Sequence, residues 1–215
     1  MSEAPQAVVA RLNAQLAAVG LDTVDSAFGG QFEDYLSLLL RWNVCVNLTA
    51  IRDEEGILSR HFVESIACAR ALPAGISTLL DFGSGAGFPG IPVALSRPEI
   101  SVTLAESQGK KAAFLHEALR VLGISANVHS GRAEALRAVF DCLTLRAVDK
   151  MDLAVQSASQ LVSPGGWLAL MTTRGELEAL KAAAGAEFSW RTAIHLPGSQ
   201  ERVLALGERT INSPA

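Results

Sequence analysis

The pattern of hydrophobic and polar positions divides the chain into two parts. Up to residue 75, apolar side chains recur at helical spacing, which is typical of amphipathic helices. This spacing predicts three helices, the third capped by Asp53 and closed by Pro73, with a short connection at Asn47–Ile51. The predicted helices cover residues 7–19, 31–44 and 53–71.

Beyond Pro73-Ala74-Gly75, short β-rich runs alternate with helical stretches. The predicted strands are Thr78–Phe82, Val102–Ala105, Ala126–His129, Cys142–Leu145, Trp167–Met171, Phe188–Ile194 and Arg202–Leu206. Such alternation predicts right-handed βαβ units and a mostly parallel, doubly wound sheet with a final antiparallel strand. We therefore predict an α/β fold: a Rossmann-like domain over residues 76–215, forming one compact unit, preceded by an N-terminal helical cap over residues 1–75.

Composition fits a soluble cytoplasmic protein. The 215 residues are 49% hydrophobic, which is enough for one sizeable core. The N-terminus lacks the basic and then apolar pattern of a secretory signal, and no stretch approaches the about 18 apolar residues of a membrane helix. Cys45, Cys68 and Cys142 match neither a disulfide framework nor a zinc site, so we predict buried thiols and no metal.

Charge alone does not indicate a nucleic-acid partner. The net charge is −4, and residues 1–75 hold 5 Lys or Arg against 9 Asp or Glu. Residues 76–215 hold 13 of each sign. A protein-wide basic field is excluded, whereas a local basic face remains open.

The most informative stretch is the glycine loop, residues 83–90, which follows the first predicted strand and opens a helix. Glycines there let the backbone turn tightly and approach a ligand, and Gly85, Gly87 and Gly90 satisfy the G-x-G-x-x-G pattern of dinucleotide sites. Asp81 favours a different ligand, because a carboxylate would repel a pyrophosphate but suits the cationic sulfonium and ammonium of S-adenosyl-L-methionine. Glu106 ends the second strand, where a carboxylate can bind ribose hydroxyls.

A set of motifs then resembles a known family. The chain carries, in order, Asn47-Leu48-Thr49-Ala50-Ile51, His61-Phe62-Val63-Glu64-Ser65, the Asp81–Pro92 loop, Glu106-Ser107 with Lys110-Lys111, Arg132-Ala133-Glu134 and Leu145-Arg146-Ala147-Val148. These motifs resemble the bacterial small-subunit ribosomal RNA guanine-N7 methyltransferases, the glucose-inhibited division protein B family. The resemblance runs from about residue 30 to the end.

This resemblance implies N7 methylation of one guanine in 16S rRNA, within the 30S subunit or an assembly intermediate, with S-adenosyl-L-methionine as donor. By position, the family's cofactor contacts fall on Gly83, Phe88, Ala133, Glu134 and Arg146. The chain departs from the family at Met171-Thr172, where Lys-Gly is usual, and Arg174 is a candidate replacement.

The substrate side rests on cationic residues. Arg146 ends the fourth predicted strand, where it is our candidate for positioning the guanine. Lys110 and Lys111 open a helix, where cations oppose the helix dipole, so phosphate contact is a hypothesis for them. Arg52 and Arg60 could extend this RNA-binding face.

The chemistry predicts positioning without a catalytic base. Guanine N7 has a lone pair and no proton, so its methylation requires no deprotonation. We expect the enzyme to act as a monomer with no membrane partner. A methyltransferase for tRNA, protein or a small molecule, an NAD-dependent oxidoreductase and a non-catalytic binder remain open at this point.

Overall fold

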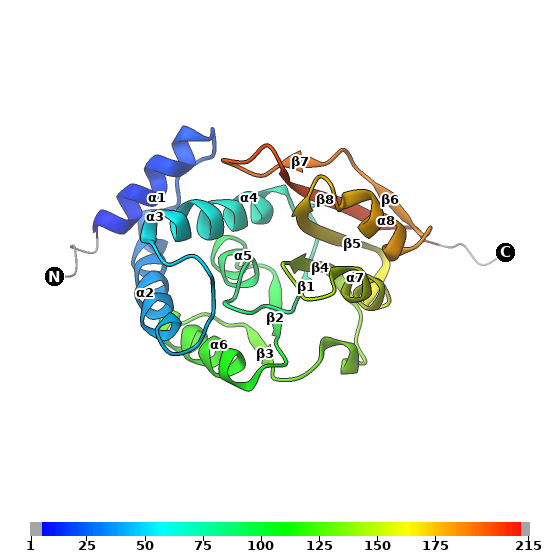
Figure 1. Ribbon diagram of the computed structural model, residues 1–215, viewed down its shortest axis with the longest axis horizontal. Coiled ribbons are helices and arrows are strands. Elements are labelled where there is room, and N and C mark those ends of the chain that lie inside the picture. The colour runs from blue at the N-terminus through cyan, green and yellow to red at the C-terminus, as the bar shows by residue number, and fades with distance from the viewer. Residues whose placement is uncertain (1–5, 212–215) are drawn as a thin grey trace.

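The computed structural model describes residues 6–211, which form a central sheet covered by helices on both faces (Figure 1). The strand order is β3-β2-β1-β4-β5-β8-β6, and β7 also pairs with β8. Five parallel strands come first in the chain: β1 (Thr78–Phe82), β2 (Ser101–Ala105), β3 (Asn127–His129), β4 (Phe140–Arg146) and β5 (Val162–Thr173). The antiparallel part follows: β6 (Phe188–Trp190), β7 (Ile194–His195) and β8 (Arg202–Arg209). The predicted doubly wound α/β fold is confirmed.

Two of the predicted strands differ most from the structure. β5 begins five residues before the predicted Trp167, at Val162, and its register against β4 shifts between Phe140 and Cys142. The predicted run Phe188–Ile194 is two short strands, β6 and β7, which pair separately with β8. β8 itself is antiparallel to β5, as the closing pair of strands predicted.

The N-terminal helices follow the apolar spacing. They are α1 (Gln6–Ala18), α2 (Ser26–Asn43), α3 (Glu54–Ile57), the π-helical turn η1 (Leu58–Val63) and α4 (Glu64–Ala71). The predicted helix over 53–71 is therefore interrupted by a π-helical turn. Its cap is confirmed, because Asp53 Oδ1 accepts a 2.7 Å hydrogen bond from the Gly56 N–H.

The two faces of the sheet bury separate hydrophobic cores. One core packs α1, α2, η1 and α4 together with α5 (Gly90–Ser96) and α6 (Gly109–Leu122). The other packs α7 (Met151–Ser159) and α8 (Leu177–Ala184). Tyr35 and Phe62 of the N-terminal helices pack against Phe88 of the glycine loop, with ring centroids 5.1 and 5.5 Å apart. The loop is thus packed from both parts of the chain.

The cysteine thiols and the length of the apolar helices were both predicted from composition. Cys68 and Cys142 are buried, but Cys45 is exposed in the turn after α2, so the prediction of three buried thiols is wrong there. None of the helices over residues 6–211 is long and apolar enough to cross a bilayer.

Candidate active site

The glycine loop lies at the carboxyl edge of the sheet, where the parallel strands end. β1 lies between β2 and β4, so the chain crosses over β1 when it passes from β3 to β4. Open α/β sheets bind ligands at such a switch point. Within residues 81–93, Gly83 and Gly85 are the two positions that are not buried. The loop therefore presents these glycines to the space above the sheet edge.

The loop has one open side and one packed side. Gly85 has a φ of +56°, and a Cβ built there meets nothing nearer than the Gly83 carbonyl oxygen at 3.9 Å. A Cβ on Gly90 would lie only 2.7 Å from Asp81 Oδ2. A ligand can approach the backbone at Gly85, whereas Gly90 has to be glycine for the helix to pack on Asp81.

Asp81 lies beneath the loop and is 1% exposed. Its Oδ2 accepts from the Gly90 N–H at 3.2 Å, and its Oδ1 accepts from the Thr144 hydroxyl at 2.8 Å. Burial raises the pKa of Asp81 to about 6, although these hydrogen bonds favour the ionised form. Asp81 therefore shapes the loop directly, and its ionised form places a negative charge beneath it.

Glu106 ties the end of β2 to the glycine loop. Its Oε2 accepts from the Gly85 N–H at 2.9 Å and its Oε1 from the Gln108 N–H at 2.7 Å. Each carboxylate oxygen has a second lone pair, so the group can still accept two further hydrogen bonds. The donor and acceptor pattern fits a ribose diol lying over Gly85.

The next strand supplies a small and an acidic position. The 3₁₀ turn η2 (Ala133–Ala135) follows β3, and it buries Ala133 while it leaves Glu134 exposed. Ala133 belongs to the same core cluster as Ala105 at the end of β2. The turn also contacts α7, the helix that follows β4.

Phe88 is held between the loop and the N-terminal helices. Its ring stacks on His61 at 4.8 Å and on Tyr35 at 5.1 Å. His61 Nε2 bonds the Thr49 hydroxyl at 2.7 Å, and its Nδ1 is buried without a protein partner. Burial and the nearby guanidinium groups of Arg146 and Arg60 lower the pKa of His61 to about 3. His61 is therefore neutral at physiological pH.

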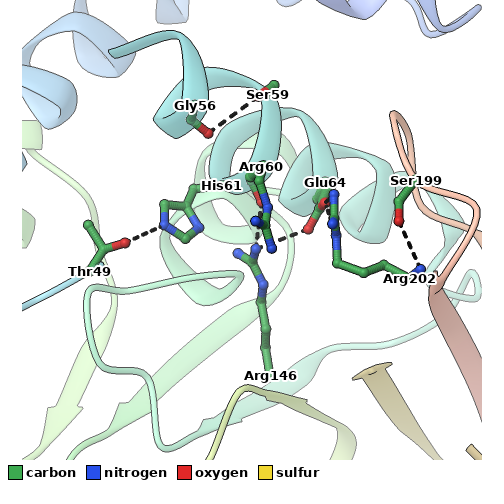
Figure 2. A network of polar contacts seen from close by, with 9 residues as sticks. All are labelled: Thr49, Gly56, Ser59, Arg60, His61, Glu64, Arg146, Ser199 and Arg202. Atoms are coloured by element: carbon green, nitrogen blue, oxygen red, sulfur yellow. Dashed lines mark hydrogen bonds and ion pairs between the residues drawn. The ribbon is translucent and has the colours of Figure 1, made fainter. Parts of the chain in front are cut away.

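Arg146 at the end of β4 reaches across to the π-helical turn. Its Nη2 donates to the Arg60 carbonyl at 2.5 Å and to Glu64 at 3.0 Å (Figure 2). Glu64 is fully buried and also accepts from Arg202 of β8 at 2.6 Å. Two guanidinium groups thus share one buried carboxylate.

The sequence-based prediction did not assign Glu64 and Arg202 to the site. Glu64 belongs to the quoted His61–Ser65 motif, but Arg202 is 138 residues away from it in the chain, and no spacing rule links them. Met171 pairs with Arg146 in the sheet and is buried. Arg174, the candidate replacement for the family's lysine, forms a 2.5 Å hydrogen bond with His195.

The four cations predicted for RNA do not form one cluster. Lys110 and Lys111 lie in the first turn of α6, the first exposed and the second half-buried. Arg52 precedes α3, where it bonds Asn47 Oδ1 at 3.2 Å, and Arg60 is exposed on η1. α6 and the α3–η1 stretch lie on different sides of the fold, at the bottom and the top of Figure 1.

Comparison with known proteins gives the family. The sequence profile described as rRNA small subunit methyltransferase G matches residues 30–204. The chain is similar to Ribosomal RNA small subunit methyltransferase G of Stenotrophomonas maltophilia, 41% identical with 90% of this chain and 91% of that one covered. The protein of the same name from Xanthomonas campestris pv. campestris is 43% identical, with coverages of 82% and 84%.

Solved structures support the fold independently. A methyltransferase from Pyrococcus furiosus superposes with a TM-score of 0.62 at 13% identity, over 84% of this chain and 98% of that one. This likeness concerns the fold alone, and the family rests on the sequence matches. The chain belongs to the rRNA small subunit methyltransferase G family.

Proposed function

We propose that this chain transfers a methyl group from S-adenosyl-L-methionine to N7 of one guanine in 16S rRNA, acting as a monomer in the cytoplasm on the 30S subunit or an assembly intermediate. Its support is membership of the family over residues 30–204 together with a carboxyl edge that has an open glycine loop. The family sets aside the oxidoreductase alternative.

The residues at this edge fit the cofactor. Glu106 binds the ribose, Gly83 and Gly85 let the methionine part approach the backbone, and the negative charge of Asp81 attracts its cationic groups. Gly87, predicted as a further contact, is buried on the packed side of the loop, where a Cβ would lie 2.8 Å from the Tyr35 hydroxyl, so it acts through the turn that its φ of +90° makes. The remaining contacts of the pocket are Phe88, Ala133, Glu134 and Arg146. When bound, S-adenosyl-L-methionine supplies an electrophilic methyl group on a sulfonium.

The absence of an accessible base near Arg146 favours N7 as the acceptor atom. Among residues 6–211, the groups beside this spot that could take a proton include His61, Asp81 and Glu64. Glu64 is fully buried and ion-paired with both Arg146 and Arg202. The pKa of about 3 makes His61 a weak base, and both Asp81 oxygens are occupied in a side chain that is 1% exposed. An acceptor that keeps a proton would need a base, whereas N7 does not.

Catalysis then depends on alignment. Arg146 lies at the end of β4, which is placed between β1, the strand before the glycine loop, and β5. From this position it can orient the guanine toward the methyl group. Lys110, Lys111, Arg52 and Arg60 contact phosphates on either side of this site, which fixes the RNA without reading its sequence.

The test is methyl transfer from labelled S-adenosyl-L-methionine to 30S subunits prepared from a strain that lacks the enzyme. We expect the label on one guanine, released as 7-methylguanosine after digestion of the rRNA. A single-turnover rate that stays flat from about pH 6 to 9 would match the absence of a base. Label on another base atom, on tRNA or on protein would contradict the assignment.

A further inference from the structure

A cluster of three arginines and one acid lies on the acceptor side of the site. Figure 2 shows Glu64 between the guanidinium groups of Arg146 and Arg202, with Arg60 next to them. Glu64 is fully buried, and the side chains of Arg146 and Arg202 are 12% and 25% exposed. One negative charge therefore faces three positive charges, so the cluster has an excess of two.

The arginines keep hydrogen-bond donors for a ligand. A guanidinium has five N–H donors in a planar fork. Arg146 uses Nη2 for Glu64 and the Arg60 carbonyl, and Arg202 uses Nε and Nη2 for Glu64. The Nη1 groups of both take no part in these bonds. Arg60 is exposed, and its carbonyl accepts from Arg146, so Arg60 lies beside the pair (Figure 2).

The cluster extends away from the cofactor loop. The loop follows β1, whereas Arg202 begins β8, three positions along the sheet order β1-β4-β5-β8. Neighbouring strands are about 4.8 Å apart, so Arg202 lies on the order of 14 Å from β1. The backbone of Arg202 is therefore well separated from the loop, and its guanidinium reaches back to Glu64.

We propose that Arg202 and Arg60 bind a phosphodiester of the RNA backbone beside the target nucleotide, and that Glu64 is a positioning residue that holds Arg202 and Arg146 in one arrangement. Guanidinium groups match phosphate oxygens in paired geometry. Because Arg146 shares Glu64 with Arg202, a phosphate seated on Arg202 fixes the base next to Arg146. This inference rests on the proposed function for the identity of the RNA.

Binding of 30S subunits from a strain lacking the enzyme, measured over a series of KCl concentrations without cofactor, tests the phosphate contact. For Arg202→Gln we expect the slope of log K against log salt to fall by about 0.7–0.9, the value for one lost contact. Arg202→Lys should keep most of the slope, because it keeps the charge. Arg120→Gln is the matched control, since Arg120 is exposed on α6 and pairs with Glu117.

The affinity of Arg202→Gln for S-adenosyl-L-methionine shows whether the cluster binds an RNA phosphate or the cofactor carboxylate. Calorimetric titration should give Arg202→Gln the parent affinity within about twofold. A parent-like salt slope for Arg202→Gln would overturn the phosphate contact, and so would a tenfold loss of cofactor affinity, which would assign the cluster to the cofactor carboxylate. Salt-dependent binding without methyl transfer would instead refute the proposed function and leave this subsite standing.

The positioning role of Glu64 is tested by measuring kcat together with the salt dependence of RNA binding. Glu64→Gln removes the charge that both arginines share, and Glu64→Asp keeps the charge on a side chain too short to reach both. For folded protein we expect each variant to lower kcat at least tenfold with a salt slope near that of the parent, because Glu64 itself does not touch RNA. If Glu64→Gln does not fold, Glu64→Asp carries the test, and a parent kcat in either folded variant would exclude the positioning role.

Discussion

Three carboxylates at the carboxyl edge of the sheet are buried, and each is compensated by a different kind of donor. Glu64 accepts from two guanidinium groups, Glu106 from two backbone N–H groups and Asp81 from one N–H and one hydroxyl. Charged partners stabilise an ionised carboxylate most strongly, and neutral donors do so less. This explains why burial outweighs hydrogen bonding at Asp81 and raises its pKa to about 6.

Cofactor affinity should therefore depend on pH through Asp81. The folded pKa of about 6 exceeds the usual 3.8, so between these values the native chain holds a proton that the unfolded chain has lost. The free energy of unfolding should fall as pH rises through this window. A bound cation favours the ionised carboxylate, so the affinity for S-adenosyl-L-methionine should rise with pH up to about 6 and then level off. Calorimetric titrations from pH 5 to 7.5 measure this.

The control is Asp81→Asn, which cannot ionise. It should weaken binding above pH 6 and remove the pH dependence. A parent affinity that is constant across the range would contradict the role given to this carboxylate.

Glu106 gives a second prediction for cofactor binding. Glu106→Ala removes the acceptor for the ribose, and hydrogen bonds to a charged group contribute about 1.5–3 kcal/mol, so binding should weaken by about tenfold to more than a hundredfold. Glu106→Gln keeps one carbonyl acceptor and should lose less. An unchanged dissociation constant for Glu106→Ala would show that the ribose is held elsewhere.

At the scale of elements, local patterns could be predicted from the sequence and long-range ones could not. β1 was predicted at its observed bounds because a short, mostly apolar run lies between a turn and the glycines, and four of its five positions are buried. The π-helical turn η1 was missed, since its apolar spacing fits an ordinary helix as well. Without that turn there was no reason to expect the Arg60 carbonyl or Glu64 to face Arg146.

The contact between α2 and the glycine loop has a measurable effect on stability. The Tyr35 hydroxyl donates to the Ala86 carbonyl at 2.5 Å in a buried position. Tyr35→Phe leaves that carbonyl without a partner, which costs about 1–3 kcal/mol. Urea unfolding should show this loss with an unchanged m-value, and cofactor affinity should fall with it. If Tyr35→Phe is as stable as the parent protein, the loop keeps its shape without this contact from α2.

The first turn of α6 gives a prediction about RNA. If Lys110 and Lys111 each contact a phosphate, changing both to Ala should lower the slope of log K against log salt by about 1.4–1.8 and leave cofactor affinity unchanged. Arg120→Gln at the other end of α6 is the control. Equal slopes for the double variant and the parent would show that these lysines only solvate the helix.

For the whole molecule, the N-terminal helices and the sheet share one core. Leu12 and Phe62 belong to the same buried cluster as Leu79 and Phe114. The Tyr35 and Arg146 hydrogen bonds also join residues before 75 to residues after it. We therefore expect a chain that starts at residue 76 to expose one face of its sheet and to fail to fold.

The intact protein should accordingly unfold in one step, and its tryptophans can report this. Trp42 on α2 packs edge-on against Phe114 with centroids 5.7 Å apart, whereas Trp190 lies on β6 at the far side of the sheet. Two variants that each keep one of these tryptophans, with the others changed to Phe, monitor the two parts separately. Coincident fluorescence transitions in urea are expected, because neither part can lose its half of the core without exposing the other. An earlier transition at Trp42 would mean that the N-terminal helices detach first. The ion pair between Glu64 and Arg146 would then break before the sheet unfolds.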